Sequence, residues 1–563
     1  MTKHSDIISS KLFIILILFS LTTIFGCDGD DWSFDLFGGD SANDDNGNNN
    51  GNGDDDNRIE LFVVSIPVDG NSDEFPAAVY SAITDDSKCN KPVKLFSSTD
   101  DGSRIKITEL TGVISCGGTG NVFKVSPDGQ RVAYLTEKKS KKDTETRISE
   151  LSSDEADVIE FDWSPDSSRI AYLVDDQSDD RVDLYTNPAE GGENRKVSGS
   201  LPLGGEVDAF EWSPDSSLLA YTANQNNLNK FELFTTLADK RDPVKVSGTV
   251  SLNRVDITKF SWSPGGSRIA YLSDQRLADF FELFTNLPRP KSNDDPDLIS
   301  ESVNVLKFSW APVEVDRSLA YSTGRELYTA RPNGDDNKRV TPALTDGGKI
   351  SDFSWAPNSA RIAYLADQES DEDFELFTVK PNGNDDLRIS GDLTDNGDVT
   401  DFSWAPDSTR IAYRADQESD EDFELFTVEP NGDDDSRISG DLTDNGDVTD
   451  FSWAPDSTRI AYRADQESNE VFELFTVEPD GDDDSRISGD LTDGGDVTDF
   501  SWAPDSSGIG YIADQETDGV LELFASTPDG ADEPVKLSGS LAEDEDGDLL
   551  FFEWAAESDS DDG

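Results

Sequence analysis

Apolar residues recur in short runs with a spacing of two, and the clearest run begins at Phe402. Phe402 and Trp404 are two residues apart, so both point to one face of a β-strand. A proline and an aspartate at 406–407 are typical turn residues, and Ile411 and Tyr413 then repeat the spacing. The pattern predicts a strand, a tight turn and a second strand.

Two more strands are expected at 423–428 and 436–439, with a Pro-Asn-Gly turn between them, and the whole unit then restarts. Its tryptophans recur every 45 to 52 residues, at Trp163, Trp212, Trp262, Trp310, Trp355, Trp404, Trp453, Trp502 and Trp554. A four-stranded unit with this period is typical of a β-propeller blade. We therefore predict an all-β propeller of about 8–10 four-stranded repeats, in a single large ring or split into two.

The amino-acid sequence of the repeat also resembles that of a known family. Residues 161–172, Phe-Asp-Trp-Ser-Pro-Asp-Ser-Ser-Arg-Ile-Ala-Tyr, are similar to the WD40-like, TolB-type propeller repeat, and the resemblance covers roughly 120–554. It implies a propeller fold and suggests a role in the cell envelope. It does not specify an activity, because one fold carries many functions.

The first residues have the form of a targeting signal. Lys3 and Lys11 make a basic start, and 12–25 is a mainly apolar run too short to span a membrane comfortably. Residues 1–27 resemble a bacterial lipoprotein signal, which implies lipidation of Cys27. The expected location is therefore outside the cytoplasm, as a membrane-anchored lipoprotein that is periplasmic or on the cell surface. An ordinary secretory signal cut nearby is the alternative.

Four further segments are distinguished by composition and repeat. Residues 28–57 are rich in Asp, Asn and Gly and are expected to form a disordered tether. Residues 58–122 are an irregular β segment expected to contribute strands that close the ring. The propeller repeats occupy 123–554, and 555–563 form an acidic tail.

Both ends of the repeat array are incomplete. Residues 58–64 resemble the third strand at 423–428, and 92–96 resemble the fourth strand at 534–538. The last repeat stops at Trp554, after its first strand. A blade begun at the C-terminus and completed by N-terminal strands would leave no open sheet edge.

The net charge bears on which partners the protein can bind, and the cysteine content bears on disulfide formation. The net charge of −73 would repel phosphate backbones, so we expect no nucleic acid to bind. In an exported protein Cys89 and Cys116 are expected to form a disulfide. The alternative is a metal site, but two cysteines without histidine lack the ligands of a closed zinc site.

Candidate chemistry is sparse. The single histidine, His4, lies in the signal, which excludes Ser-His-Asp and Cys-His catalysis. Acidic loops at 369–373, 418–422 and 433–435 could offer oxygen ligands to calcium, and solvated charge is the other interpretation. The Asp-Gln pair that begins at Asp416 recurs in several blades, which indicates a turn-stabilising hydrogen bond. We predict no catalytic residue and no cofactor, with calcium as the alternative.

These observations lead to a functional prediction. The protein is expected not to be an enzyme and to act as a non-catalytic binding or scaffold module with a protein partner in the cell envelope. The alternatives are a calcium-dependent adhesion or glycan-binding protein and a carboxylate-based hydrolase. The hydrolase would need a blade whose acids depart from the repeat and line a pocket.

Overall fold

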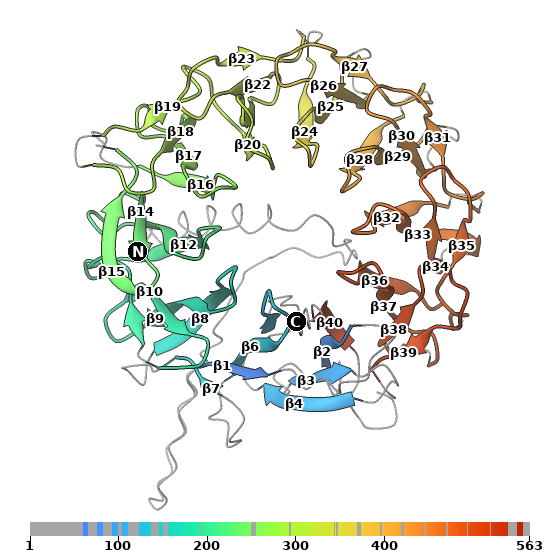
Figure 1. Cartoon of the computed structure of the whole chain (residues 1–563), viewed down its shortest axis with the longest axis horizontal. Helices are drawn as coiled ribbons and strands as arrows, with labels where there is room; N and C mark the ends of the chain where they lie inside the picture. Colours follow the sequence, from blue (N-terminus) through green and yellow to red (C-terminus); the bar gives the residue numbers. More distant parts are fainter. Residues whose placement is uncertain are drawn as a thin grey trace, which may run out of the picture.

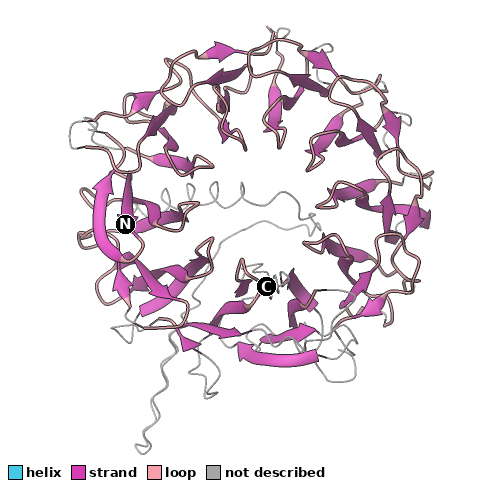
Figure 2. Ribbon diagram, in the orientation of Figure 1, coloured by secondary structure: helices cyan, strands magenta, loops and turns pink. Residues whose placement is uncertain are grey.

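The computed structural model is built from β-strands (Figure 2). It describes residues 60–65, 76–82, 93–98, 104–110, 123–136, 146–149, 156–192, 194–248, 255–291, 294–342, 344, 347–368, 373–394, 397–417, 422–443, 446–468, 471–492, 494–517, 519–538 and 549–555. Over these ranges, strand is the regular secondary structure, and no helix is long and apolar enough to cross a membrane.

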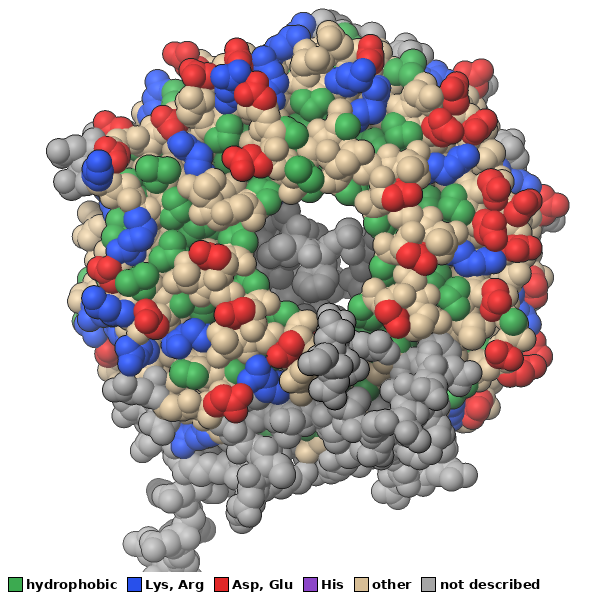
Figure 3. Space-filling view, in the orientation of Figure 1, with side chains coloured by type: hydrophobic (Ala, Val, Ile, Leu, Met, Phe, Trp, Pro, Cys, Tyr) green, Lys and Arg blue, Asp and Glu red, His purple; other side chains and the backbone are tan. Residues whose placement is uncertain are grey.

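The described strands form ten four-stranded antiparallel sheets, which are the blades of one ring around a central opening (Figures 1 and 3). The ring confirms the all-β propeller prediction. We number the blades along the chain from 1 to 10. Blades 2 to 9 each consist of four consecutive strands, and the first strand of each blade lies nearest the opening.

The strand bounds of these eight blades follow, each from the innermost strand outward. Blades 2 to 5 contain β8 (Ala156–Trp163), β9 (Arg169–Asp176), β10 (Arg181–Pro188) and β11 (Arg195–Lys196); β12 (Val207–Trp212), β13 (Leu218–Ala223), β14 (Glu232–Leu237) and β15 (Lys240–Lys245); β16 (Ile257–Trp262), β17 (Ile269–Ser273), β18 (Glu282–Asn286) and β19 (Asp297–Leu298); and β20 (Lys307–Trp310), β21 (Leu319–Ser322), β22 (Leu327–Ala330) and β23 (Lys338–Arg339). Blades 6 to 9 contain β24 (Ile350–Trp355), β25 (Ile362–Ala366), β26 (Glu375–Val379) and β27 (Leu387–Arg388); β28 (Val399–Trp404), β29 (Ile411–Ala415), β30 (Glu424–Val428) and β31 (Ser436–Arg437); β32 (Val448–Trp453), β33 (Ile460–Ser468), β34 (Val471–Val477) and β35 (Ser485–Arg486); and β36 (Val497–Trp502), β37 (Ile509–Ala513), β38 (Glu522–Ser526) and β39 (Val535–Lys536).

Blade 7 shows why the repeat folds as it does. Phe402 is paired with Tyr413 and Trp404 with Ile411, as the spacing of two predicts. Tyr413 then stacks on Phe426 of the third strand, with ring centroids 5.3 Å apart. The aromatic residues of three neighbouring strands therefore lie in register.

The Pro-Asp turn of blade 7 is fixed by its own side chains. The carboxylate of Asp407 accepts a hydrogen bond of 2.9 Å from the backbone N–H of Thr409, as expected for a turn aspartate. Ser408 has φ of 66°, in the left-handed region. The backbone N–H of Asp407 donates to the hydroxyl of Ser457 in the next blade, so the turn also ties two blades together.

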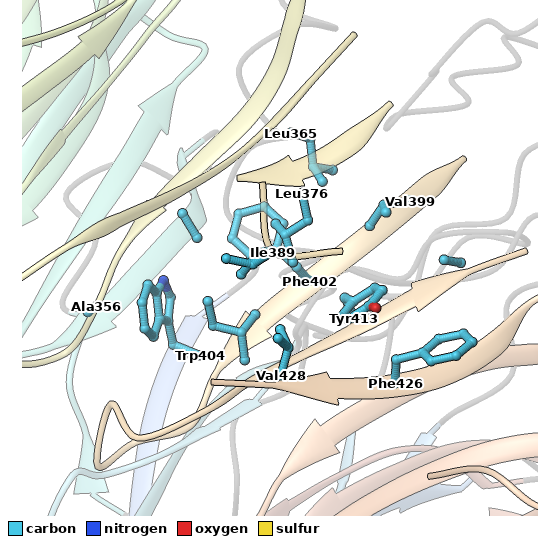
Figure 4. Packing of buried hydrophobic residues seen from close by; sticks show 13 residues of the cluster. Ala356, Leu365, Leu376, Ile389, Val399, Phe402, Trp404, Tyr413, Phe426 and Val428 are labelled. Atoms are coloured by element: carbon cyan, nitrogen blue, oxygen red, sulfur yellow. The ribbon is translucent and has the colours of Figure 1, made fainter. Parts of the chain in front are cut away.

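The hydrophobic core lies between blades. Leu365, Leu376 and Ile389 of blade 6 pack against Phe402 and Trp404 of blade 7 (Figure 4). Equivalent clusters join other pairs of neighbouring blades. The Phe and Trp of the repeat are therefore core residues that hold blade against blade.

Each of these tryptophans also makes one hydrogen bond across its junction. Its indole N–H donates to the backbone carbonyl of the residue that precedes the equivalent position in the previous blade. Nine such bonds of 3.0–3.4 Å lie in the described part of the chain: Trp163 to Lys124, Trp212 to Asp162, Trp262 to Glu211, Trp310 to Ser261, Trp355 to Ser309, Trp404 to Ser354, Trp453 to Ser403, Trp502 to Ser452 and Trp554 to Ser501.

Blades 1 and 10 are assembled from separate parts of the chain. Blade 1 contains β5 (Phe123–Val125), β6 (Arg131–Thr136), β1 (Glu60–Ser65) and β7 (Thr146–Arg147), and blade 10 contains β40 (Leu549–Trp554), β2 (Ala78–Ala82), β3 (Val93–Ser98) and β4 (Arg104–Leu110). The C-terminal β40 thus pairs with β2 from the N-terminal region and closes the ring.

Two N-terminal segments resemble strands of the blades, and the structure confirms one of the two assignments and corrects the other. β1 is the third strand of blade 1, as its similarity to 423–428 suggested. β3 is also a third strand, so the fourth-strand prediction for 92–96 is wrong. The reason is that β4 pairs with the outer edge of β3, which the short sequence match could not show.

If the ring is closed, Trp404→Phe and Trp554→Phe should destabilise the fold to a similar degree. Each change keeps an aromatic ring and removes one indole donor, to Ser354 or to Ser501. We expect the free energy of unfolding in urea to fall by about 0.5–1.5 kcal/mol for each variant, because each loses one hydrogen bond across a junction. If Trp554→Phe alone left the free energy of unfolding unchanged, the junction between blades 9 and 10 would not contribute to the stability of the ring.

Candidate functional site

Each innermost strand has one residue between its Phe position and its Trp position, and the type of this residue separates the blades into two groups. Six consecutive blades have serine there: Ser261, Ser309, Ser354, Ser403, Ser452 and Ser501. The other four blades, which are neighbours across the closure of the ring, carry charged residues instead. In order around the ring these are Glu553, Lys124, Asp162 and Glu211, on β40, β5, β8 and β12.

These four charged residues line one cavity of about 350 Å³. Four neighbouring innermost strands supply its walls, and two Pro-containing turns complete it. Besides the four charged side chains, the lining residues are Val125, Pro127, Trp163, Pro165 and Trp212. A pocket with aromatic walls and a few convergent charges is the usual form of a small-molecule site.

The pocket forms at the junction that lacks a tryptophan. Val125 pairs with Val132 as Trp163 pairs with Ile170, so Val125 holds the tryptophan position of blade 1. It has no indole to donate across to blade 10. Instead the backbone N–H of Val125 donates to the Glu553 carboxyl oxygen Oε2 at 2.6 Å. A side chain of blade 10 thus makes the contact that a ring makes elsewhere.

An ion pair at this site joins blade 1 to blade 2. Nζ of Lys124 lies 3.0 Å from Oδ1 of Asp162 and 5.8 Å from the ring centre of Phe161. The two charged side chains are 31% and 49% exposed. A pair this exposed contributes less than about 1 kcal/mol to stability, so its main effect is to fix charge at the site.

Burial changes the acidity of the two glutamates. Burial raises the pKa of Glu553 to about 7, although the hydrogen bond from Val125 and the charge of Lys124 oppose the change. Burial likewise raises the pKa of Glu211 to about 7, against a hydrogen bond from the Trp262 backbone and the charge of Lys259. The charge of Asp162 adds to the rise of both. Both glutamates therefore exchange protons near neutral pH.

The two glutamates face different surroundings. The groups that act on Glu553 are Val125, Lys124 and Asp162, which belong to the pocket. Besides burial, the groups that act on the pKa of Glu211 are Trp262 and Lys259 of blade 4 and then Asp162 of the pocket. A carboxyl group that is protonated near neutral pH therefore lies beside an ion-paired carboxylate. This combination can transfer protons in both directions.

The recurring acids of the repeat have structural roles. Oδ1 of Asp416 accepts the backbone N–H of Asp398, as expected for a turn-stabilising aspartate. Asp435, in the third acidic loop, accepts a hydrogen bond of 2.5 Å from the Tyr413 hydroxyl. Most of the loops at 369–373 and 418–422 lies outside the described residues.

No group of three or more His, Cys, Asp or Glu that could hold a metal ion occurs in the part of the chain that the structure describes. Calcium binding by the remaining acidic loops stays a prediction. Cys27, Cys89 and Cys116 also lie outside the described residues, so the lipidation site and the disulfide stay predictions as well.

No protein-family model matches the chain, and no curated protein matches its sequence. Among solved structures, Porphyromonas gingivalis dipeptidyl peptidase 4 is similar with a TM-score of 0.45 and 14% identity, over 81% of this chain and 60% of that one. An oligogalacturonate lyase in complex with manganese gives a TM-score of 0.32 and 12% identity, over 56% of this chain and 86% of that one. A puromycin hydrolase gives 0.31 and 14%, over 62% and 57%. At such identities the likeness shows the fold alone.

The functional prediction needs correction. A non-catalytic scaffold that is not an enzyme is contradicted by these neighbours, which are a peptidase, a lyase and a hydrolase. The prediction relied on acids that recur in several blades, such as Asp416. The acids of the pocket lie at another position of the repeat, where most blades have serine.

One signal in the sequence could have located the site. An alignment of the Phe-x-Trp triplets shows charged residues in the middle position only at Lys124, Asp162, Glu211 and Glu553. One of the four positions is distant from the others in sequence, because Glu553 follows Val125 by 428 residues. Ring closure is what brings them together.

Glu553→Gln should change how stability depends on pH. The pKa of Glu553 is about 7 in the fold against an ordinary value of 4.5, so the unfolded chain releases this proton first as pH rises. Folding stability contributed by the protonated group is therefore lost between about pH 4.5 and 7. Gln carries no such proton, so the variant should lose less stability across this window and be the more stable protein at pH 8.

Asp215→Asn is the control with the opposite sign. Hydrogen bonds from Ser213 and Ser217 lower the pKa of Asp215, so its ionised form stabilises the fold. This variant should be less stable than the unchanged protein at pH 7, and the difference should shrink in acid. The measurement is urea unfolding at a series of pH values. Parallel curves for Glu553→Gln and the unchanged protein would contradict the raised pKa.

Proposed function

We propose that this propeller is an enzyme that hydrolyses glycosidic bonds in the pocket at the ring closure, with Glu553 as proton donor and Asp162 as base. The observation that carries the proposal is the pocket itself. It is the place where the acids depart from the repeat, and it pairs a protonated carboxyl group with an ion-paired carboxylate.

The available residues favour this chemistry. The sequence has one histidine, His4, so a histidine base for acyl transfer is not available in the pocket. Glycosidic hydrolysis needs only two carboxyl groups with different protonation states. The hydroxyl groups of a sugar also suit carboxylate acceptors such as those that line the pocket.

In the proposed step, Glu553 acts as the acid and Asp162 as the base. Glu553 donates its proton to the glycosidic oxygen as the bond from that oxygen to the anomeric carbon breaks. Asp162 accepts a proton from water, whose oxygen forms the new bond to the anomeric carbon. Lys124 forms an ion pair with Asp162 at 3.0 Å. The products are a free reducing end and an alcohol, and the proton returns to Glu553 through solvent.

The test measures reducing ends released from a panel of neutral polysaccharides and aryl glycosides. Glu553→Gln and Asp162→Asn should each lower the rate on a cleaved substrate by at least about 100-fold, because each removes a proton-transfer group. Asp441→Asn is the matched control, because Asp441 is an exposed carboxylate paired with Arg437 and does not line the pocket. It should retain most of the activity.

Two results would overturn the proposal. One is the absence of any reducing end with the unchanged protein across the panel. The other is an unchanged rate for Glu553→Gln on a substrate that the protein does cleave. Thermal unfolding of each variant confirms that a lost rate does not come from a lost fold.

We also propose that the enzyme works outside the cytoplasm, held to a membrane by lipid on Cys27. The lipoprotein-type pattern at 1–27 and the TolB-type wording of the repeat support this location. Cys27→Ser should move the protein from the membrane fraction to the soluble fraction of cells that process lipoproteins. Equal membrane association of the variant and the unchanged protein would contradict lipid anchoring.

A further inference from the structure

One side of the ring exposes leucines in the connections of four consecutive blades. Strands within a blade are antiparallel, so two kinds of connection lie on the same side: from the second strand to the third, and from the fourth strand to the next blade. We call this side the hairpin face. Its connections in blades 2 to 5, which follow one another around the ring (Figure 1), carry four leucines that we call the leucine patch. They are Leu203 (68% exposed), Leu228 (47%), Leu277 (58%) and Leu306 (60%).

Hydrogen bonds fix these connections to the neighbouring blades. In the connection that carries Leu203, the backbone N–H of Glu206 donates to the side chain of Asn224 at 2.7 Å. In the next such connection, the side chain of Asn304 accepts the backbone N–H of Phe281 at 2.8 Å. The leucines are therefore presented by ordered parts of the ring.

The charge of the hairpin face differs between its two halves. The segments between the second and third strands of blades 3 to 5 contain three basic and three acidic residues; they are 224–231, 274–281 and 323–326. The equivalent segments of blades 6 to 9 contain sixteen acidic residues and no basic one; they are 367–374, 416–423, 465–472 and 514–521. The leucine patch thus lies on the half of this face whose segments balance their charge. A lipid surface can approach it without the repulsion that the other half would impose.

The N-terminal part of the chain joins the ring on this same face. β1 is the third strand of blade 1, and it begins at Glu60, which is paired with Thr136 at the end of the second strand. The start of a third strand lies on the hairpin face. Residues 1–59, which include the proposed lipid site Cys27, therefore connect to the fold on this face, in the blade next to blade 2. A lipid on Cys27 would bring a bilayer to the hairpin face at a high effective concentration.

We propose that the leucine patch is a docking surface for a lipid bilayer, which the ring contacts through blades 2 to 5. Each leucine that enters the boundary of the acyl chains strengthens binding in proportion to the apolar area removed from water. The acidic segments of blades 6 to 9 lie away from the bilayer. This inference rests on the proposed lipid anchoring, because the anchor brings the bilayer to this face.

Docking through the leucine patch has a consequence for the pocket. Pro127 and Pro165, which line the cavity, belong to the turns that follow the first strands of blades 1 and 2. A first strand begins on the hairpin face and ends on the opposite face, so these turns lie on the side away from the bilayer. The docked ring therefore holds the pocket toward the aqueous phase.

The first test is co-sedimentation of the full chain carrying Cys27→Ser with phosphatidylcholine vesicles. This change removes the lipid site, and all variants share the same N-terminal segment, so differences between them come from the ring. Adding Leu228→Ser and Leu277→Ser should weaken vesicle binding by at least about tenfold, because two leucines no longer leave water.

The matched control changes two apolar residues of similar exposure on the opposite face. Leu287 (46% exposed) follows the third strand β18, and Val313 (52%) follows the first strand β20. Leu287→Ser with Val313→Ser should leave vesicle binding unchanged. All four side chains are exposed, so both double variants should fold as the unchanged protein does.

A second measurement places the bilayer directly and works on the lipidated protein as well. Leu277→Trp adds an indole to the leucine patch, and Val313→Trp adds one to the opposite face. Vesicles of brominated phosphatidylcholine, whose bromine quenches indole fluorescence on contact, should quench the added emission of Leu277→Trp. They should leave the added emission of Val313→Trp unchanged.

The outcomes separate docking from anchoring and from activity. A loss of binding specific to the leucine variant, with quenching of Leu277→Trp, supports docking even if Cys27 proves not to be lipidated. Equal binding of the two double variants, or equal quenching at the two tryptophans, overturns docking even if lipid on Cys27 holds the protein to membranes. A dimer that forms without lipid and that Leu228→Ser with Leu277→Ser dissociates also overturns it, because the patch then joins two copies. None of these results depends on hydrolysis.

Discussion

The ring depends on one contact repeated between blades, in which a tryptophan packs against the previous blade and donates its indole N–H to that blade's innermost strand. A single four-stranded sheet of this kind has two faces to cover and cannot cover them alone. The core is therefore shared between neighbouring blades, as in the cluster formed by residues of blades 6 and 7. Closure of the ring follows from the same need, because an array that stopped would expose a face at each end.

Closure also explains where the exceptions gather. The two chain ends meet at blades 10 and 1, and blade 1 takes its third strand from β1 while blade 10 takes three strands from the N-terminal region. Blades 10 and 1 both contain strands from the N-terminal region, so the chain itself links these two blades without a tryptophan contact. Val125 can then replace tryptophan, and charged residues can replace serine, without opening the ring. The pocket lies where the repeat is least constrained by packing.

Much of the fold could be predicted from the sequence, because the signal is local and repeated. The spacing of Phe402, Trp404, Ile411 and Tyr413 reports which residues share a strand face, and the pairing in blade 7 agrees. The position of β3 could not be predicted in this way, since a five-residue likeness carries no information about which edge is already occupied. Blade number also needed the structure, because the sequence counted repeats but did not show how the ends combine.

The candidate site was harder to predict for a different reason. Glu553 and Lys124 are ordinary charged residues in their own segments, and only the ring brings them to one cavity. The raised pKa of Glu553 comes from burial, which the sequence does not report. The substitution at Val125 was visible in the sequence as a degenerate repeat. Its consequence, a junction bridged by the Glu553 carboxyl group, appears only when blade 10 is placed beside blade 1.

The central claim is that a protonated Glu553 does chemistry in the pocket of the broken junction. The most direct measurement is kcat/KM between pH 4 and 9 on whichever glycoside the protein cleaves. The account predicts that kcat/KM falls above about pH 7, as Glu553 loses its proton in the free enzyme. A rate that stays constant or rises up to pH 9 would contradict the assignment of Glu553 as proton donor.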